Sequence, residues 1–344
     1  MRQHIKSIDY LRVISILAVV LIHTTTRTLE TVGYDLNGFP MTLFLNQIAR
    51  FAVPLFILIS GFVLEISYNP KENYFSFIKR RFSKIFIPYI FWSAIYYFFV
   101  YNQNHDNFLK VILTGNASYQ LYFIPTLCIF YLLFPFLYKI YNLISKWWSL
   151  TILGISQILL MRYDYFVKQF SVSDPLRVLI LSYFLFIIGI VAARNKEKIF
   201  EIIRKIKYAF IVLIPSLAFY LFEEGRSRYF LTYDIKAFYS QWRPSVFVYT
   251  VLVSLILFYI FEKSKFQSML MEKLSKLSFL VFFIHVIVLE NLWAIFGKNL
   301  FNIFSKSLGG RIFFDPIFFG MVAITSFFIA FILHKIPKLW RVTG

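Results

Sequence analysis

Ten long apolar segments divide the sequence and constrain its fold more than any other feature. They cover residues 8–26, 42–67, 84–101, 119–140, 147–163, 175–193, 207–222, 241–261, 277–297 and 314–336. A transmembrane helix needs about 20 predominantly apolar residues, and most of these segments approach that length. The sequence therefore predicts an all-α polytopic membrane protein of about ten transmembrane helices, organised as one integral-membrane domain over residues 1–344. The seventh segment is short, and its ends are the least defined.

The composition makes lipid the solvent of this chain. Hydrophobic residues make up 59% of the sequence and charged residues 15%, whereas an ordinary soluble domain is about 45–50% apolar and about 25% charged. The first apolar run continues past the length of a signal-peptide core and lacks a small-residue cleavage site, so we interpret it as a span. Cys128 is the only cysteine. It predicts a buried packing thiol, with no disulfide framework and no metal site.

The distribution of charge predicts the orientation in the membrane. Most of the 36 Lys and Arg residues lie in the even-numbered loops and at the termini, where they include Arg2, Lys338 and Arg341, while acidic residues gather in the odd-numbered loops. The positive-inside rule then places both termini in the cytoplasm. The net charge of +19 is divided among loops between spans, which argues against nucleic-acid binding. A polar stretch at 107–113 predicts an interfacial helix.

The first segment carries ionisable residues that are costly in hydrocarbon. Arg12 and His23 are eleven residues apart, a spacing that closes three helical turns to within about 20° and separates the two by about 16 Å along the axis. One face of this helix therefore presents a cation toward the cytoplasm and an imidazole toward the outside. Asp9 marks the cytoplasmic entry and is expected to pair with a nearby base. The alternative is that Arg12 snorkels to the headgroups and His23 sits in the outer interface.

Two further spans carry candidate site residues. Arg50 lies in the outer half of the second segment, at a depth similar to that of His23, and Pro54 and Gly61 follow it. His285 lies near the middle of the ninth segment. A polar residue within a span is by default a candidate functional residue. A snorkelling Arg50 and a structural, hydrogen-bonded His285 are the alternatives.

A basic cluster opens the third segment at the predicted cytoplasmic face. Arg80, Arg81 and Lys84 are adjacent or one helical turn apart, so they can converge on an anion. Ordinary positive-inside charge that binds lipid phosphate is the alternative.

In sequence order, five motifs resemble the integral-membrane acyltransferase family 3, whose members modify bacterial surface glycans. They are IDYLRVISILAVVLIH with Arg12 and His23, RFAVPLFILISGFVL with Arg50 and the Ser60-Gly61-Phe62 triplet, RRFSKIFIPY, LYFIPTLCIFYLLFP and LSFLVFFIHVIVL with His285. The resemblance covers essentially the whole chain. We expect none of the appended esterase-like domains that some members carry.

The chain departs from the family pattern at three places. Where the family usually has Arg-x-x-Arg, this chain has Arg81-Phe82-Ser83-Lys84. A lysine lacks the bidentate fork of an arginine that suits a phosphate. The usual Trp-Phe of the fourth helix is Tyr122-Phe123. The Tyr that is common before the late histidine is replaced, in this chain, by Phe282 and Phe283.

The resemblance implies a transfer of an acyl group, often acetyl, from cytoplasmic acyl-CoA to a hydroxyl at or beyond the outer face of a bacterial cytoplasmic membrane. Arg80, Arg81 and Lys84 would bind the donor phosphates. Arg12, which lies deeper in the membrane on the same side, would hold the pantetheine or thioester end of the donor. His23 would act as general base or transient acyl carrier, and Arg50 would stabilise the oxyanion or orient the reactants.

The weaker candidates are Ser60, Tyr122, His285 and Asp9, which would line the acyl tunnel or support the site. Simple helix packing is the alternative for Ser60. The expected partners are membrane lipids, acyl-CoA and a glycan or lipid-linked glycan. The acceptor, the length of the acyl chain and the oligomeric state stay open.

A rival interpretation is a transporter or flippase for a small metabolite or a lipid-linked sugar. Polar residues spread through the bilayer fit that function too. Inverted repeats are common in transporters, and no repeat is visible in this sequence.

Overall fold

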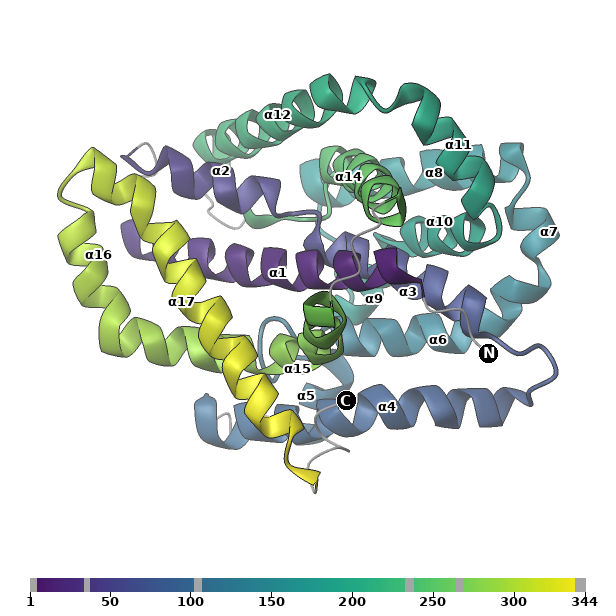
Figure 1. Ribbon diagram of the computed structural model, residues 1–344, viewed down its shortest axis with the longest axis horizontal. Helices are drawn as coiled ribbons and strands as arrows, with labels where there is room; N and C mark the ends of the chain where they lie inside the picture. The colour runs from purple at the N-terminus through teal and green to yellow at the C-terminus, as the bar shows by residue number, and fades with distance from the viewer. Residues whose placement is uncertain (1–4, 34–37, 102–106, 233–237, 264–268, 338–344) are drawn as a thin grey trace. The chain divides into compact units, whose positions relative to one another are not determined.

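A computed structural model of the protein describes residues 5–33, 38–101, 107–232, 238–263 and 269–337 (Figure 1). Within these ranges the chain is helical and contains no β-strand. The terminal charges Arg2, Lys338 and Arg341, on which the predicted orientation partly rests, lie outside the described residues.

The helices follow one another along the chain with short connections. They are α1 (Lys6–Val32), α2 (Pro40–Ile48), α3 (Ala52–Ser67), α4 (Tyr74–Ile95), η2 (Tyr96–Val100), α5 (Phe108–Thr114), α6 (Phe123–Lys139), α7 (Tyr141–Ile144), α8 (Trp147–Arg162), η3 (Tyr163–Val167), α9 (Asp174–Ile180), α10 (Tyr183–Arg194), α11 (Lys196–Ile206), α12 (Ala209–Thr232), α14 (Pro244–Lys263), α15 (Met269–Leu292), η4 (Trp293–Gly297), α16 (Lys298–Phe304) and α17 (Leu308–His334).

This architecture confirms an all-α polytopic membrane protein. In the described part of the chain, seven helices are long and apolar enough to cross a membrane, or up to nine if each of two bent pairs is one span. The pairs are α9 with α10, bent by 54°, and α11 with α12, bent by 88°. The shorter apolar helix α6 coincides with the fourth predicted segment. Each of the ten predicted segments thus corresponds to a span, a bent pair or this shorter helix.

Several helices extend beyond the predicted segments because their polar residues find partners. The helix of the third predicted segment, α4, begins at Tyr74. The Asn73 side chain caps it by accepting a hydrogen bond from the backbone N–H of Phe75 at 2.9 Å. The basic cluster therefore lies within a helix. Asn107 caps α5 in the same way, so the polar stretch at 107–113 is helical as predicted.

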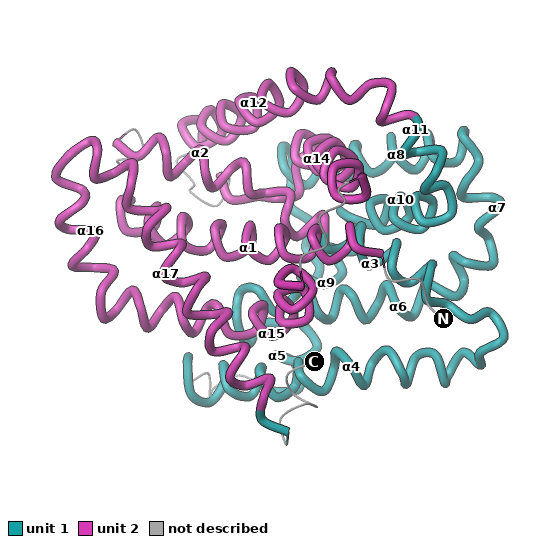
Figure 2. The backbone as a smooth tube through the Cα atoms, in the orientation of Figure 1, with its two compact units in different colours: residues 1–4, 56–201, 336–344 teal, residues 5–55, 202–335 magenta. Residues whose placement is uncertain are grey.

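Two compact units make up the chain (Figure 2). Unit 1 contains residues 1–4, 56–201 and 336–344, and unit 2 contains residues 5–55 and 202–335.

In unit 1, helices α3 and α10 approach closely at two glycines. A Cβ atom added to Gly61 would overlap the carbonyl oxygen of Phe186, and one added to Gly189 would overlap the carbonyl oxygen of Leu58. Small residues of this kind let membrane helices pack backbone against backbone. Aromatic rings fill the adjoining core, where Phe130 stacks on Phe186 with ring centroids 4.4 Å apart. The Ser60-Gly61-Phe62 triplet therefore has a packing role.

In unit 2, α1 is the central helix and packs against α2, α14, α15 and α17. Of the residues in its most apolar window, 67% are buried, compared with 28% for α17. The exposed apolar surface of α17 is the kind that lipid covers, while α1 faces protein on most sides. Polar side chains on α1 must consequently find partners within the protein.

We expect Gly189→Ala to destabilise the protein by about 1–3 kcal/mol, because the new Cβ must displace backbone of α3. The control is Gly320→Ala on α17, where nothing lies within 4 Å of the added atom. Thermal melting in detergent measures both. A melting temperature for Gly189→Ala that equals or exceeds the wild-type value would contradict the close approach.

Candidate functional site

A break in the second span places Arg50. Helix α2 ends at Ile48, α3 begins at Ala52, and the backbone N–H of Arg50 donates to the Gln47 carbonyl at 3.1 Å. Pro54, in the first turn of α3, explains the break, because its ring would clash with the carbonyl of Arg50 in a continuous helix. Irregular backbone is tolerated at membrane depth where it is buried in protein. Arg50 is indeed buried, with 3% of its surface exposed.

Helices α1 and α15 bring His23 and His285 together in unit 2. The two ring centroids are 5.2 Å apart, at an interplanar angle of 35°. Arg50 lies within electrostatic range of His23. His23 is half-buried, whereas His285 is fully buried. Of the three, His23 is thus the side chain that a substrate can reach most directly, and we call these three residues the histidine–arginine cluster.

The backbone of α15 fixes the orientation of His285. Its Nδ1 lies 3.0 Å from the Val281 carbonyl oxygen, and a hydrogen bond to a carbonyl requires that Nδ1 carries the proton. In the neutral ring, Nε2 then presents its lone pair. Nε2 is buried and makes no hydrogen bond within the described part of the chain. His285 therefore offers an acceptor inside the cluster.

Two neighbours hold the guanidinium of Arg50. Nη1 donates to the Tyr239 carbonyl at 2.6 Å, and Nη2 donates to Oδ1 of Asn46. The guanidinium carbon also lies 5.6 Å from the centre of the Tyr239 ring. Arg50 is thus anchored inside the protein and does not snorkel.

The N-terminal part of α1 carries Asp9 and Arg12. Asp9 is buried and accepts a hydrogen bond from the Ser275 hydroxyl at 2.7 Å, and Lys276 is within its electrostatic range. Arg12 is half-buried. Three helical turns separate it from His23, so the structure does not bring Arg12 into the histidine–arginine cluster.

Glu290 belongs to a separate ion-pair group. Its carboxylate lies 3.3 Å from Nη2 of Arg27, whose guanidinium also lies 5.5 Å from the centre of the Trp293 ring. Glu290 and His285, on the same helix, therefore have different neighbours.

Sequence analysis missed a second group of buried polar residues in unit 2. They are Thr25, Thr28, Thr42, Asn46, Gln47, Glu224, Arg243 and Asp315. Glu224 lies on α12 and Asp315 on α17, and Arg243 immediately precedes α14. The adjacent Asn46 and Gln47 within an apolar segment were a readable signal, since amides in a span need partners.

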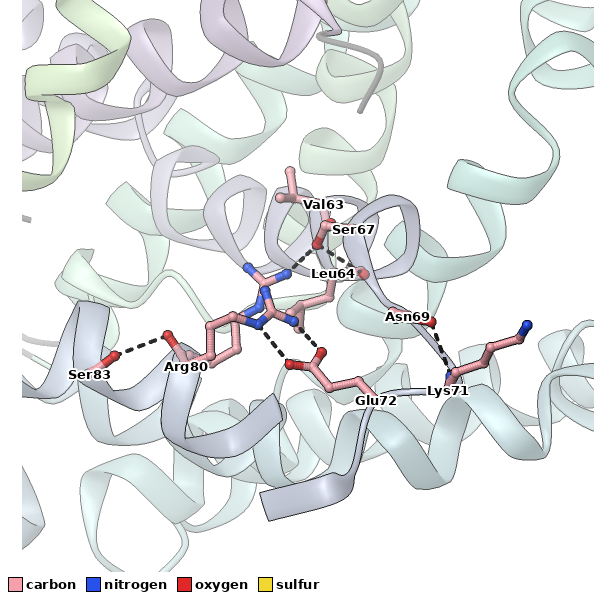
Figure 3. A network of polar contacts seen from close by, with 9 residues as sticks. Val63, Leu64, Ser67, Asn69, Lys71, Glu72, Arg80 and Ser83 are labelled. Carbon is pink, nitrogen blue, oxygen red and sulfur yellow. Dashed lines mark hydrogen bonds and ion pairs between the residues drawn. The ribbon is translucent and has the colours of Figure 1, made fainter. Parts of the chain in front are cut away.

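In unit 1, the basic cluster is already engaged with neighbours (Figure 3). Nε of Arg80 donates to Oε1 of Glu72 at 2.9 Å, and Nη2 of Arg80 pairs with Oε2 at 2.5 Å. Arg81 donates to the Ser67 hydroxyl. Lys84 is exposed. A bound anion would therefore have to compete with Glu72 for Arg80.

The two weaker candidates of unit 1 have structural surroundings. The Ser60 hydroxyl donates to the Phe56 carbonyl at 2.8 Å, within its own helix. Tyr122 stands at the start of α6 against Gly115, which has a φ of 76° and no room for a Cβ.

The comparison with known protein families decides the assignment. The family model described as an acyltransferase domain, which is that of acyltransferase family 3, matches residues 5–335. The chain belongs to this family. The resemblance read from the five motifs is confirmed, and the protein is a member of a membrane acyltransferase family.

Curated relatives match over most of their length. They include the "Probable poly-beta-1,6-N-acetyl-D-glucosamine export protein" of Staphylococcus aureus strain MSSA476 and its counterpart in strain MRSA252. Each is 24% identical over 325 residues, which is 87% of either chain. No solved structure matches the acyltransferase.

We expect Asp315 to stabilise unit 2 through two hydroxyl groups. Thr28 donates to its Oδ1 at 2.6 Å, and Thr42 donates to its Oδ2. Asp315→Ala leaves both buried hydroxyls without their acceptor, at a cost of about 1–3 kcal/mol each. Asp315→Asn keeps one carbonyl acceptor and should lose less. Melting temperatures in detergent measure this, with Thr31→Ala, an exposed threonine of α1, as control. Equal melting temperatures for Asp315→Ala and the wild type would contradict the assignment.

Proposed function

We propose that the protein transfers an acyl group, often acetyl, from cytoplasmic acyl-CoA to a hydroxyl of a cell-surface or lipid-linked glycan. The observation that carries the proposal is the histidine–arginine cluster in the core of a chain that matches an acyltransferase family. The polysaccharide in the relatives' names supports a glycan as the acceptor. The protein would work in a bacterial cytoplasmic membrane, with both termini in the cytoplasm.

His23 is the proposed general base. It takes the proton from the acceptor hydroxyl as the oxygen attacks the thioester carbonyl, and the coenzyme A thiolate leaves when the tetrahedral intermediate collapses. Imidazole suits this step because its unperturbed pKa is close to neutrality. A transient acyl-imidazole on His23, formed with loss of the thiolate and resolved by the hydroxyl, is the covalent alternative.

Arg50 is the proposed stabiliser of the oxyanion. Its guanidinium is anchored before the reaction by Tyr239 and Asn46, so it needs little reorganisation when charge develops on the carbonyl oxygen. His285 is proposed to support His23, because its ring lies next to the His23 ring and its Nε2 can accept a hydrogen bond.

Arg80, Arg81 and Lys84 are the proposed ligands of the donor phosphates, and Arg12 is the proposed ligand of the pantetheine or thioester end. Guanidinium groups bind phosphate strongly through charge-assisted hydrogen bonds. Ser60, Tyr122 and Asp9 are proposed only as supporting residues, because each has a structural environment that accounts for it.

Export of a glycan is the second candidate function. The relatives are named as export proteins, and this observation favours it. Purified protein in detergent discriminates between the two: hydrolysis or transfer of labelled acetyl-CoA supports the acyltransferase, whereas glycan flux in proteoliposomes without acyl transfer supports the exporter.

His23→Ala should abolish glycan acylation in a host that lacks the activity, because no base remains to deprotonate the hydroxyl. General bases contribute about 10²–10⁴-fold to a rate. Mass spectrometry of surface glycans measures the loss. The control is His334→Ala, which removes an exposed histidine at the end of α17. Normal acylation by a normally expressed His23→Ala variant would exclude the catalytic role.

Arg81→Ala should weaken acyl-CoA binding by about 10-fold or more, as expected for a lost hydrogen bond to a charged group worth about 1.5–3 kcal/mol. Isothermal titration in detergent measures the affinity. Lys79→Ala, an exposed neighbour on the same helix, should leave it unchanged. If Arg81→Ala binds acyl-CoA normally, the cluster would instead serve lipid binding and topology.

A further inference from the structure

A second buried arginine lies in unit 2, outside the histidine–arginine cluster. Arg243 immediately precedes α14 and is fully buried. Its Nη1 lies 3.2 Å from Oε2 of Glu224 on α12, and the Ser245 hydroxyl donates to the same carboxylate oxygen. Only 10% of the Glu224 side chain is exposed. Arg243 and Glu224 thus form an ion pair that is almost completely buried.

Two amides connect this ion pair to Arg50. Nη2 of Arg243 donates to Oε1 of Gln47, and Nε2 of Gln47 donates to Oδ1 of Asn46 at 3.3 Å. The same Oδ1 accepts from Nη2 of Arg50. A continuous row of contacts therefore runs from the Glu224 carboxylate to the guanidinium of Arg50.

The row is also tied to the helix that carries His23. Nδ2 of Asn46 donates to the hydroxyls of Thr25 and Thr26 on α1, at 2.9 and 3.1 Å. These threonines are two and three residues beyond His23 in the sequence. Asn46 therefore holds Arg50 with its oxygen and the His23 segment of α1 with its nitrogen.

Stability alone does not explain the ion pair. Removing two charges from water is costly, and well-packed apolar residues in place of a buried pair are often neutral or stabilising. A guanidinium that forms an ion pair with a carboxylate and donates a hydrogen bond to an amide does, however, fix the amide in one orientation. Through Gln47 and Asn46, that constraint reaches Arg50.

We infer that Arg243 and Glu224 are positioning residues for the transfer, which act through Gln47 and Asn46 to hold the Arg50 guanidinium beside His23. This inference rests on the proposed function, because it depends on Arg50 taking part in the reaction. Neither Arg243 nor Glu224 needs to touch a substrate. A misplacement of about 1 Å at a reacting centre can cost about 100-fold in rate.

The test uses the full chain, purified in detergent, in the acyl-transfer assay. Gln47→Met cuts the row while leaving both arginines and Glu224 in place. The double variant Glu224→Gln/Arg243→Met removes both charges at once, so that no lone buried charge remains. The control, Glu223→Gln/Arg226→Met, removes the more exposed ion pair of α12, whose charged groups lie 3.0 Å apart.

We expect Gln47→Met and the double variant to lower kcat by about 100-fold, with the KM for acetyl-CoA and the melting temperature unchanged. The control pair should keep the wild-type kcat. Arg243→Lys, which retains the charge but cannot bond the carboxylate and the amide through one planar fork, should fold normally and lose part of kcat. If the double variant fails to insert into the membrane, the kcat of Arg243→Lys tests the positioning role instead.

Wild-type kcat in Gln47→Met and in either Arg243 variant would overturn the inference. A kcat that falls only in proportion to the folded fraction would also overturn it, since the ion pair would then be structural. If the wild type transfers no acyl group, or if His23→Ala is fully active, the proposed function itself fails and the positioning role fails with it.

Discussion

Lipid cannot solvate a polar group, and this constraint organises unit 2. A buried amide, hydroxyl or charge is therefore costly unless it finds a partner within the protein. Helix α1 meets the constraint by placing polar residues against α2, α15 and α17. Its threonines contact Asn46 and Asp315, and His23 meets His285. Some of the polar contacts between these helices, His23 with His285 and Asn46 with Thr25, therefore also involve the proposed reacting groups or their direct neighbours.

The break between α2 and α3 shows how the constraint serves chemistry. A continuous helix would point Arg50 along one fixed direction, whereas the break lets its guanidinium reach the Tyr239 carbonyl and the Asn46 amide. The costs of burying the charge and of interrupting the helix are offset by those contacts. The result is a cation fixed within electrostatic range of His23 before any substrate arrives, which is the arrangement that electrostatic catalysis requires.

The sequence predicted the spans well because apolar length and lipid thickness are local properties. Similar depths for His23 and Arg50 were predicted from their positions along their own spans, and the two residues do lie within electrostatic range of each other. The row from Glu224 to Arg50 was not readable, because Gln47 and Arg243 are 196 residues apart in the sequence and no local pattern joins them. The pairing of Arg80 with Glu72 was not readable for a different reason: Glu72 lies in the bend before α4, eight residues before Arg80, where no helical spacing joins the two.

The order of the two units along the chain separates the proposed phosphate ligands from the histidine–arginine cluster. Residues 56–201 of unit 1 form one continuous insertion between residues 5–55 and 202–335 of unit 2. The basic cluster lies entirely within the insertion, and the histidine–arginine cluster with its row of contacts lies entirely outside it. A chimaera that takes residues 56–201 from a relative would replace every proposed phosphate ligand and leave the histidine–arginine cluster and its row of contacts unaltered. Donor preference and acceptor chemistry could thus evolve by exchange of blocks, with crossover points inside α3 and α11.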